Sequence, residues 1–250
     1  MTTLLALASP ELCAAALRQP VPASAEDAVR VIGAGATAMG LDVVCTPWDQ
    51  AAEAAAVRAR LGAGPSGDDG RLEWADTVTR WLVATPDHRP VVGVVSGPVW
   101  LAVGAANDGS GDPQEALDEA SDFVAARVRT LCELGVAQVV VIERGGAGAT
   151  PEPGAAADAH TAIARLGRHF GVAVTLAALD DGVPAEDLGY ERWVSPGAAA
   201  SGLALVAASA LGRVAQGGLC GVECVVTEYL LHADVTPEAV REAAGSVRRG

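Results

Sequence analysis

The 250-residue chain is half hydrophobic, contains few aromatic residues and carries a formal net charge of −14. This charge argues against nucleic acids and anionic membrane surfaces as partners, because both attract basic patches. All 17 residues counted as lysine or arginine are arginine. Aldolases that use a lysine Schiff base, and enzymes that bind pyridoxal phosphate covalently, are therefore excluded.

The cysteine content indicates a reducing compartment. The five cysteines are Cys13, Cys45, Cys132, Cys220 and Cys224. An odd number without a recognisable secretory signal favours free thiols. Two uncharged stretches, 90–107 and 193–212, contain too many small residues and prolines for membrane spans. We therefore expect a cytoplasmic protein that does not cross a membrane.

Short apolar runs alternate with helical patterns along the chain. The runs that predict strands are a weak candidate at 3–8, then 42–45, 91–96, 138–142, 172–179, a weak candidate at 191–195, and 223–228. The main runs lack polar alternation, which is typical of parallel strands buried on both faces. Between them, Ser24 with Asp27 has the spacing of a helix cap, and Asp112 and Thr236 each precede a proline that can open a helix.

This order of strands and helices predicts a single α/β domain over residues 1–250. Six or seven strand candidates fit a TIM-type (β/α)8 barrel, with one unit reduced or missing, or a doubly wound sheet. In both architectures ligands bind at the carboxyl ends of the strands. Polar residues at these ends are therefore the candidates for a functional site.

Four predicted strands end in polar residues, which are Asp49, Ser96, Glu143 with Arg144, and Glu228 with Tyr229. We expect them at one end of the sheet, where Arg144 can bind an anion and Glu143 can exchange a proton. Two structural alternatives stay open. Asp49 can cap the following helix, and Glu143 with Arg144 can form a salt bridge at the rim. Trp48 and Trp100 can line a pocket or pack in the core.

Four segments resemble the superfamily of uroporphyrinogen decarboxylase and cobalamin-independent methionine synthase. They read "GLDVVCTPWDQAAEAAAVRARLG", "RPVVGVVSGPVWLAV", "LGVAQVVVIERGGAGATPE" and "DVTPEAVREAAGSVRR". The resemblance implies a TIM-type barrel with its site at the carboxyl ends of the strands. It places Asp49 at the position of the aspartate that holds the pyrrole nitrogens of the decarboxylase substrate. It also makes Arg18 a carboxylate clamp, puts Tyr229 at the position of a late catalytic histidine, and implies a homodimer.

The chain departs from this family at several points. The Gly-Asn-Leu-Asp-Pro motif is absent, and the segment between Trp193 and Cys220 is short. The zinc-binding His-x-Cys pair of the methyltransferase branch is missing too, so we expect no catalytic zinc. Cys220, Cys224 and His232 remain an alternative metal set, although no fourth ligand is evident.

The sequence therefore predicts an enzyme that decarboxylates a small, anionic, carboxylated metabolite without a metal or another cofactor. The predicted catalytic residues are Asp49, Glu143 and Tyr229, and the predicted substrate-binding residues are Arg18, Trp48, Ser96 and Arg144. Two alternatives are a methyl or group transferase of the methionine synthase-like branch, and a non-catalytic barrel that binds a ligand or a partner subunit.

Overall fold

The computed structural model describes residues 3–5, 9–62, 70–85, 89–107, 112–145, 152–180, 188–195, 198–199, 203–206, 224–227 and 236–247. The strands are β1 (Thr3–Leu5), β2 (Val44–Cys45), β3 (Val91–Ser96), β4 (Gln138–Glu143), β5 (Ala173–Ala178), β6 (Arg192–Ser195), β7 (Ala198–Ala199), β8 (Leu203–Val206) and β9 (Cys224–Thr227). The helices are α1 (Pro10–Leu17), α2 (Ala25–Met39), α3 (Gln50–Arg60), α4 (Arg71–Ala84), α5 (Pro98–Asn107), α6 (Pro113–Leu134), α7 (Pro153–Phe170) and α9 (Pro237–Val247).

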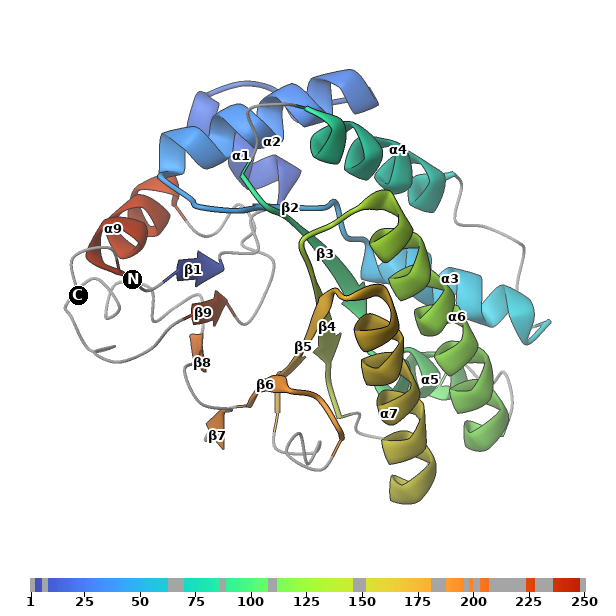
Figure 1. Cartoon of the computed structure of the whole chain (residues 1–250). Helices are drawn as coiled ribbons and strands as arrows, with labels where there is room; N and C mark the ends of the chain where they lie inside the picture. Colours follow the sequence, from blue (N-terminus) through green and yellow to red (C-terminus); the bar gives the residue numbers. More distant parts are fainter. Residues whose placement is uncertain are drawn as a thin grey trace.

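The strands form an α/β barrel with two hydrogen-bonded sections. One section has the order β2-β3-β4-β5-β6-β7, and the other has the order β1-β9-β8. All neighbours pair in parallel except β6 and β7. Strand β8 lies next to β6, and α9 packs against α1, α2 and β1, so the first and last described elements lie side by side (Figure 1). Among the described residues, five strands pair in parallel in the first section and three in the second, and the predicted barrel is confirmed.

Most of the predicted elements are present at nearly the predicted positions. Strand β3 covers the whole run 91–96, and β4 extends the run 138–142 by one residue. The predicted helix caps are also confirmed. The Ser24 hydroxyl accepts the backbone N–H of Asp27 at 3.1 Å. Asp112 and Thr236 accept N–H groups in the first turns of α6 and α9. Strand β8, by contrast, was not predicted.

The two faces of the six-stranded section pack against different partners. Val92, Val94, Val140 and Ile142 belong to the core inside the barrel, with Trp48 and Trp100 packed against it. The residues that alternate with them, such as Val139 and Val141, belong to the core between the sheet and the helices. Because side chains alternate along a strand, Ser96 falls on the inner face of β3 and Glu143 on the outer face of β4.

Helices α6 and α7 cover the outside of the sheet beside β4 and β5 (Figure 1). Each is amphipathic, and each ends at a glycine with left-handed backbone, Gly135 (φ 88°) and Gly171 (φ 68°). In the part of the chain that the structure describes, no helix is both long and apolar enough to cross a membrane.

Candidate functional site

A pocket of about 850 Å³ lies beyond the carboxyl ends of β1, β2 and β3. Its described walls come from the starts of α1 and α5, the segment between β2 and α3, and helices α3, α4 and α6. The polar and aromatic side chains that line it are Ser9, Glu11, Trp48, Asp49, Gln50, Glu53, Arg71, Trp74, Trp100 and Arg127. This is the end of the barrel at which the sequence predicts a site.

Trp48 forms one wall of the pocket and is held by its indole N–H. Its Nε1 lies 3.0 Å from Glu53 Oε2 and 3.1 Å from Ser96 Oγ, so the N–H is shared between two acceptors. The ring of Trp48 contacts that of Trp100, with centroids 5.8 Å apart and planes tilted by 59°. The predicted residues Trp48 and Ser96 are thus brought together, although Ser96 is completely buried behind Trp48.

Glu53 is a buried carboxylate that lines this pocket, and its side chain is 2% exposed. Its Oε2 also accepts the backbone N–H of Ser96 at 2.9 Å. Burial raises the pKa of Glu53, because the charged form loses its hydration. The hydrogen bonds from Ser96 and Trp48 and the positive charge of Arg127 offset only part of this increase.

Arg127 brings a guanidinium group from α6 to the same pocket. Its Nη1 lies 2.7 Å from Asp76 Oδ1, and its side chain is 12% exposed. Its Nε is buried and, among the described residues, has no hydrogen-bond partner. A buried guanidinium nitrogen without an acceptor raises the free energy of the folded chain. An anion bound at this end of the pocket would give this nitrogen an acceptor, in addition to the ion pair that Arg127 forms with Asp76.

Asp49 lies at the N-terminus of α3 and acts as its cap. Its Oδ1 accepts the N–H of Ala52 at 3.0 Å, and its Oδ2 lies 2.8 Å from Arg71 Nη1. Partial burial tends to raise the pKa of Asp49, but Arg71 and the N–H groups of Ala51 and Ala52 outweigh it and lower the pKa. The capping alternative is therefore confirmed. The proposed catalytic role of Asp49 remains a prediction, and its side chain does line the pocket.

Glu143 does not point into the barrel mouth. Its side chain is completely buried behind the sheet, where Oε1 accepts the N–H groups of Trp100 (2.7 Å) and Arg144 (2.9 Å). Its Oε2 accepts the N–H of Val99 at 3.0 Å. The Glu143 carboxylate, which belongs to β4, therefore caps the N-terminus of α5, the helix that follows β3. A Cβ atom on Gly97 would collide with this carboxylate, which explains a glycine at that position.

His160 and Tyr190 complete the buried surroundings of Glu143. His160 Nε2 lies 3.0 Å from Glu143 Oε2, but the angles do not form a hydrogen bond, and the nitrogen is otherwise without a partner in the described part. His160 Nδ1 lies 3.1 Å from the Tyr190 hydroxyl. Burial and the nearby Glu143 raise the pKa of Tyr190 well above 10. This cluster is absent from the pocket lining.

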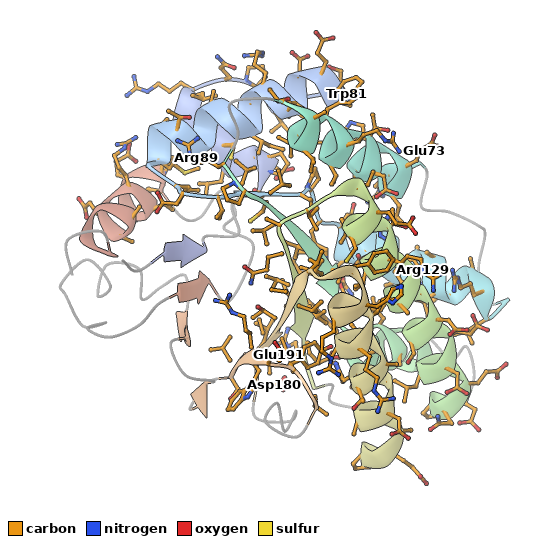
Figure 2. The ribbon with its side chains drawn as sticks, viewed as in Figure 1. Glu73, Trp81, Arg89, Arg129, Asp180 and Glu191 are labelled. Carbon is orange, nitrogen blue, oxygen red and sulfur yellow. The ribbon has the colours of Figure 1, made fainter. Side chains whose placement is uncertain are left out.

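The other predicted site residues lie elsewhere. Arg144 is half-exposed, with its Nε 4.0 Å from Asp180 Oδ2. Asp180 follows β5 and so marks the carboxyl end of the sheet. Figure 2 shows it at the opposite end from Arg89, which precedes β3. Arg18 is exposed just after the last residue of α1, about 12 Å along this eight-residue helix from its pocket-lining start. Tyr229 lies outside the described residues.

Sequence reasoning missed Glu53 and Arg127. Glu53 follows Asp49 by four residues, so both fall on one face of the predicted helix, and this spacing was an available signal. Arg127 gave no such signal, because α6 reaches the pocket only through tertiary packing. Within the described ranges, no three His, Cys, Asp or Glu side chains gather as metal ligands. The side chains of Cys220, Cys224 and His232 lie outside them, so the absence of zinc stays a prediction.

Comparison with known proteins supports the fold. No protein-family model matches the chain, and the search of curated proteins found no match. Among solved structures, a methyltransferase from Methanosarcina mazei matches with a TM-score of 0.71 and 13% identity, over 99% of this chain and 94% of the other. A phosphoenolpyruvate phosphomutase from Streptomyces platensis subsp. rosaceus matches at 0.46 and 13% identity, over 100% and 81%. At such identities the first match shows a shared α/β barrel fold.

Proposed function

We propose that this barrel is an enzyme that decarboxylates a small carboxylated metabolite in the pocket beyond β1, β2 and β3. The observation that carries the proposal is the presence of a buried acid, Glu53, and a largely buried cation, Arg127, in one pocket. Such a pair, placed among aromatic side chains at the carboxyl ends of barrel strands, is typical of a catalytic site. The resemblance to uroporphyrinogen decarboxylase points to the same class of reaction.

Arg127 and Glu53 have complementary roles in this proposal. Arg127 binds the carboxylate that will leave, because a guanidinium group matches the geometry of a carboxylate. When CO2 leaves, its bonding electron pair stays on the adjacent carbon, and that carbon must gain one proton. Glu53 supplies this proton, because its raised pKa keeps more of the acid form than an exposed glutamate would keep.

The arrangement of hydrogen bonds around Glu53 suits a proton donor. Both Trp48 Nε1 and the N–H of Ser96 donate to Oε2. In this proposal Oε2 is the oxygen that accepts these hydrogen bonds, and Oε1 is the oxygen that carries the proton to be transferred. Asp49 is the weaker candidate for this role, because its lowered pKa keeps it ionised. In this proposal Asp49 orients Arg71 beside the pocket.

A second candidate is transfer of a methyl group or another small group. The observation in its favour is that the solved structure with a TM-score of 0.71 is described as a methyltransferase. In this case the pocket binds the same carboxylated compound through Arg127. Mass spectrometry separates the two reactions when a thiol is added as methyl acceptor, because the bound acid passes a methyl group to the thiol in one reaction and loses CO2 in the other.

The test uses a mixture of aliphatic and aromatic acids labelled with ¹³C in the carboxyl group. We expect the wild-type protein to release ¹³CO2 from at least one acid and Glu53→Gln to release none. Arg127→Gln should weaken binding of the acid at least tenfold. Asp76→Asn is the matched control, because it breaks the same 2.7 Å ion pair but keeps the guanidinium group.

Three outcomes separate the proposals. Release of ¹³CO2 that depends on Glu53 and Arg127 supports decarboxylation. Loss of a methyl group without ¹³CO2 supports group transfer. Binding that weakens in Arg127→Gln but not in Asp76→Asn, without any chemical change, supports the non-catalytic barrel. If Arg127→Gln and Asp76→Asn behave alike, the role of Arg127 in binding is wrong.

A further inference from the structure

The pocket concentrates the tryptophans of this chain. Three of its five tryptophans, Trp48, Trp74 and Trp100, line the same space. Trp48 and Trp100 are tilted by 59° with their centroids 5.8 Å apart, so together they form a corner instead of a flat stack. A planar ring that stacks on one of these indoles meets the other at an angle, and both contacts are favourable for aromatic pairs.

Both members of this corner are held by contacts that do not depend on a ligand. The Trp48 indole N–H is held by Glu53 and Ser96. The indole of Trp100 packs against that of Trp48 and against the core inside the barrel, and its backbone N–H donates to Glu143 Oε1 at 2.7 Å. Side chains that are ordered before binding lose little conformational entropy when a ligand arrives. The corner is therefore a preformed surface for a flat ligand.

The two polar groups that such a ligand needs lie near each other, because the charge of Arg127 acts on Glu53. Arg127 provides a positive charge for an anionic substituent, and Glu53 contacts the indole of Trp48 and lines the same pocket. An acid next to an aromatic wall can protonate a carbon atom of a ring that lies on that wall. The resulting ring cation is then stabilised by the faces of the neighbouring indoles.

We propose that the substrate is an electron-rich aromatic carboxylate, such as a hydroxylated benzoate, bound against Trp48 and Trp100 with its carboxylate toward Arg127. This inference rests on the proposed decarboxylation and names its substrate class. Hydroxyl or amino substituents matter, because they donate the electron density that a ring carbon needs to accept a proton. An aliphatic acid of the same size lacks both the flat face and this reactivity.

The reaction balances without a cofactor. Glu53 transfers its proton to the ring carbon that carries the carboxylate, and a carbon–hydrogen bond forms there at the expense of the ring's π electrons. The bond from that carbon to the carboxylate then breaks, its electron pair restores the aromatic ring, and CO2 leaves. Glu53 ends as a carboxylate and regains its proton from solvent, so the net change is replacement of CO2 by hydrogen.

The first experiment compares ligands that differ in one feature each. Isothermal titration of the wild-type protein with benzoate, cyclohexanecarboxylate and benzyl alcohol separates the flat ring from the carboxylate. We expect benzoate to bind at least tenfold more tightly than either of the others. Trp100→Leu should abolish the preference for the flat ring, whereas Trp100→Phe should keep most of it.

The second experiment follows the chemistry in the wild-type protein and needs no variant. Carboxyl-¹³C-labelled 2,4-dihydroxybenzoate, 4-hydroxybenzoate and 4-aminobenzoate are incubated with the protein in D2O. We expect ¹³CO2 from at least one of them, with one deuterium in the product at the carbon that carried the carboxylate. Benzoate, which lacks a donating substituent, should react at least a hundredfold more slowly.

Failure of this inference differs from failure of the proposed function. Equal affinity for benzoate and cyclohexanecarboxylate, or ¹³CO2 from aliphatic acids alone, would overturn the aromatic substrate class and leave the decarboxylase proposal intact. The absence of ¹³CO2 from all three electron-rich acids would also overturn it. If no acid in the wider mixture reacts and Arg127→Gln binds acids like the wild type, both proposals are wrong.

Discussion

Glu53 and Glu143 are both buried glutamates at the same end of the barrel, yet their surroundings differ. Glu143 is 0% exposed and accepts three backbone N–H groups at the start of α5 and the end of β4. Glu53 is 2% exposed, accepts an indole N–H and one backbone N–H, and lines the pocket. Backbone donors make a carboxylate part of the framework. Side-chain donors beside a cavity leave it available for chemistry.

The sharpest way to test this contrast is to remove the Glu143 carboxylate. Glu143→Ala leaves the N–H groups of Val99, Trp100 and Arg144 without their acceptor in a buried place. We expect the free energy of unfolding to fall by about 3–5 kcal/mol, measured by urea denaturation. Glu143→Gln keeps one acceptor oxygen and should lose clearly less. A loss below about 1 kcal/mol for Glu143→Ala would show that the cap contributes little.

Two glycines test the packing around the same cap, because Gly97 contacts the Glu143 carboxylate and Gly104 serves as a control inside α5. Gly97→Ala places a methyl group against the Glu143 carboxylate, and we expect a loss of about 2–3 kcal/mol. Gly104 lies inside α5 with nothing within 4 Å of an added Cβ. Gly104→Ala should therefore gain about 0.5–1 kcal/mol, because alanine favours the helix. Similar effects at both positions, measured by thermal unfolding, would contradict this account.

The two carboxylates also show what the sequence can and cannot predict. Strand positions followed from continuous apolar runs, because runs such as 91–96 and 138–142 must be buried. The same continuity hides which face points inward, because both faces of a buried parallel strand are apolar. Ser96 and Glu143 both end strands, but only the structure shows that one faces the barrel interior and the other the helices.

Contacts between residues close in sequence could be predicted, whereas contacts between residues far apart in sequence could not. The cap formed by Asp49 was predictable, because its partner Ala52 is three residues away. The cap formed by Glu143 was not, because its partners Val99 and Trp100 lie 44 and 43 residues away. The ion pair between Arg127 and Asp76 spans 51 residues. The pocket therefore combines a predictable segment at 48–53 with residues that only tertiary packing brings to it.

The pH dependence of the unfolding free energy tests the second of the two buried glutamates, Glu53. Its pKa is higher in the folded chain than its ordinary value near 4.5, so folding favours the protonated form. The contribution of Glu53 to stability is therefore fully present below pH 4.5 and is lost as the pH rises through the folded pKa. Glu53→Gln stays neutral, so its stability relative to the wild type should improve as the pH rises from 4.5 to 8.

Urea denaturation of both proteins across this pH range measures the difference, and the other carboxylates cancel in the comparison. A pH-independent difference would mean that Glu53 titrates alike in the folded and unfolded chains. Its proposed role as proton donor would then lose its electrostatic support.

The smallest effect on the free energy of unfolding is expected at Asp49, which lines the same pocket as Glu53 but is partly exposed. Asp49→Ala removes the cap of α3 and should cost about 1 kcal/mol. Asp49→Asn keeps an oxygen for the N–H of Ala52 and loses only the ion pair with Arg71, which is worth at most about 1 kcal/mol at such exposure. Because Arg71 and the N–H groups lower its pKa, this ion-pair contribution should be present above pH 3.8 and should fade at lower pH.

Asp49→Asn also separates the structural role of this residue from the catalytic role that the sequence predicts. If Asp49 only caps α3 and orients Arg71, the variant should unfold within about 1 kcal/mol of the wild type and should still release ¹³CO2. If Asp49 takes part in proton transfer, release should fall by a large factor while the unfolding free energy stays the same. Measuring both quantities on this variant and on Glu53→Gln shows which of the two carboxylates in the pocket carries the proton.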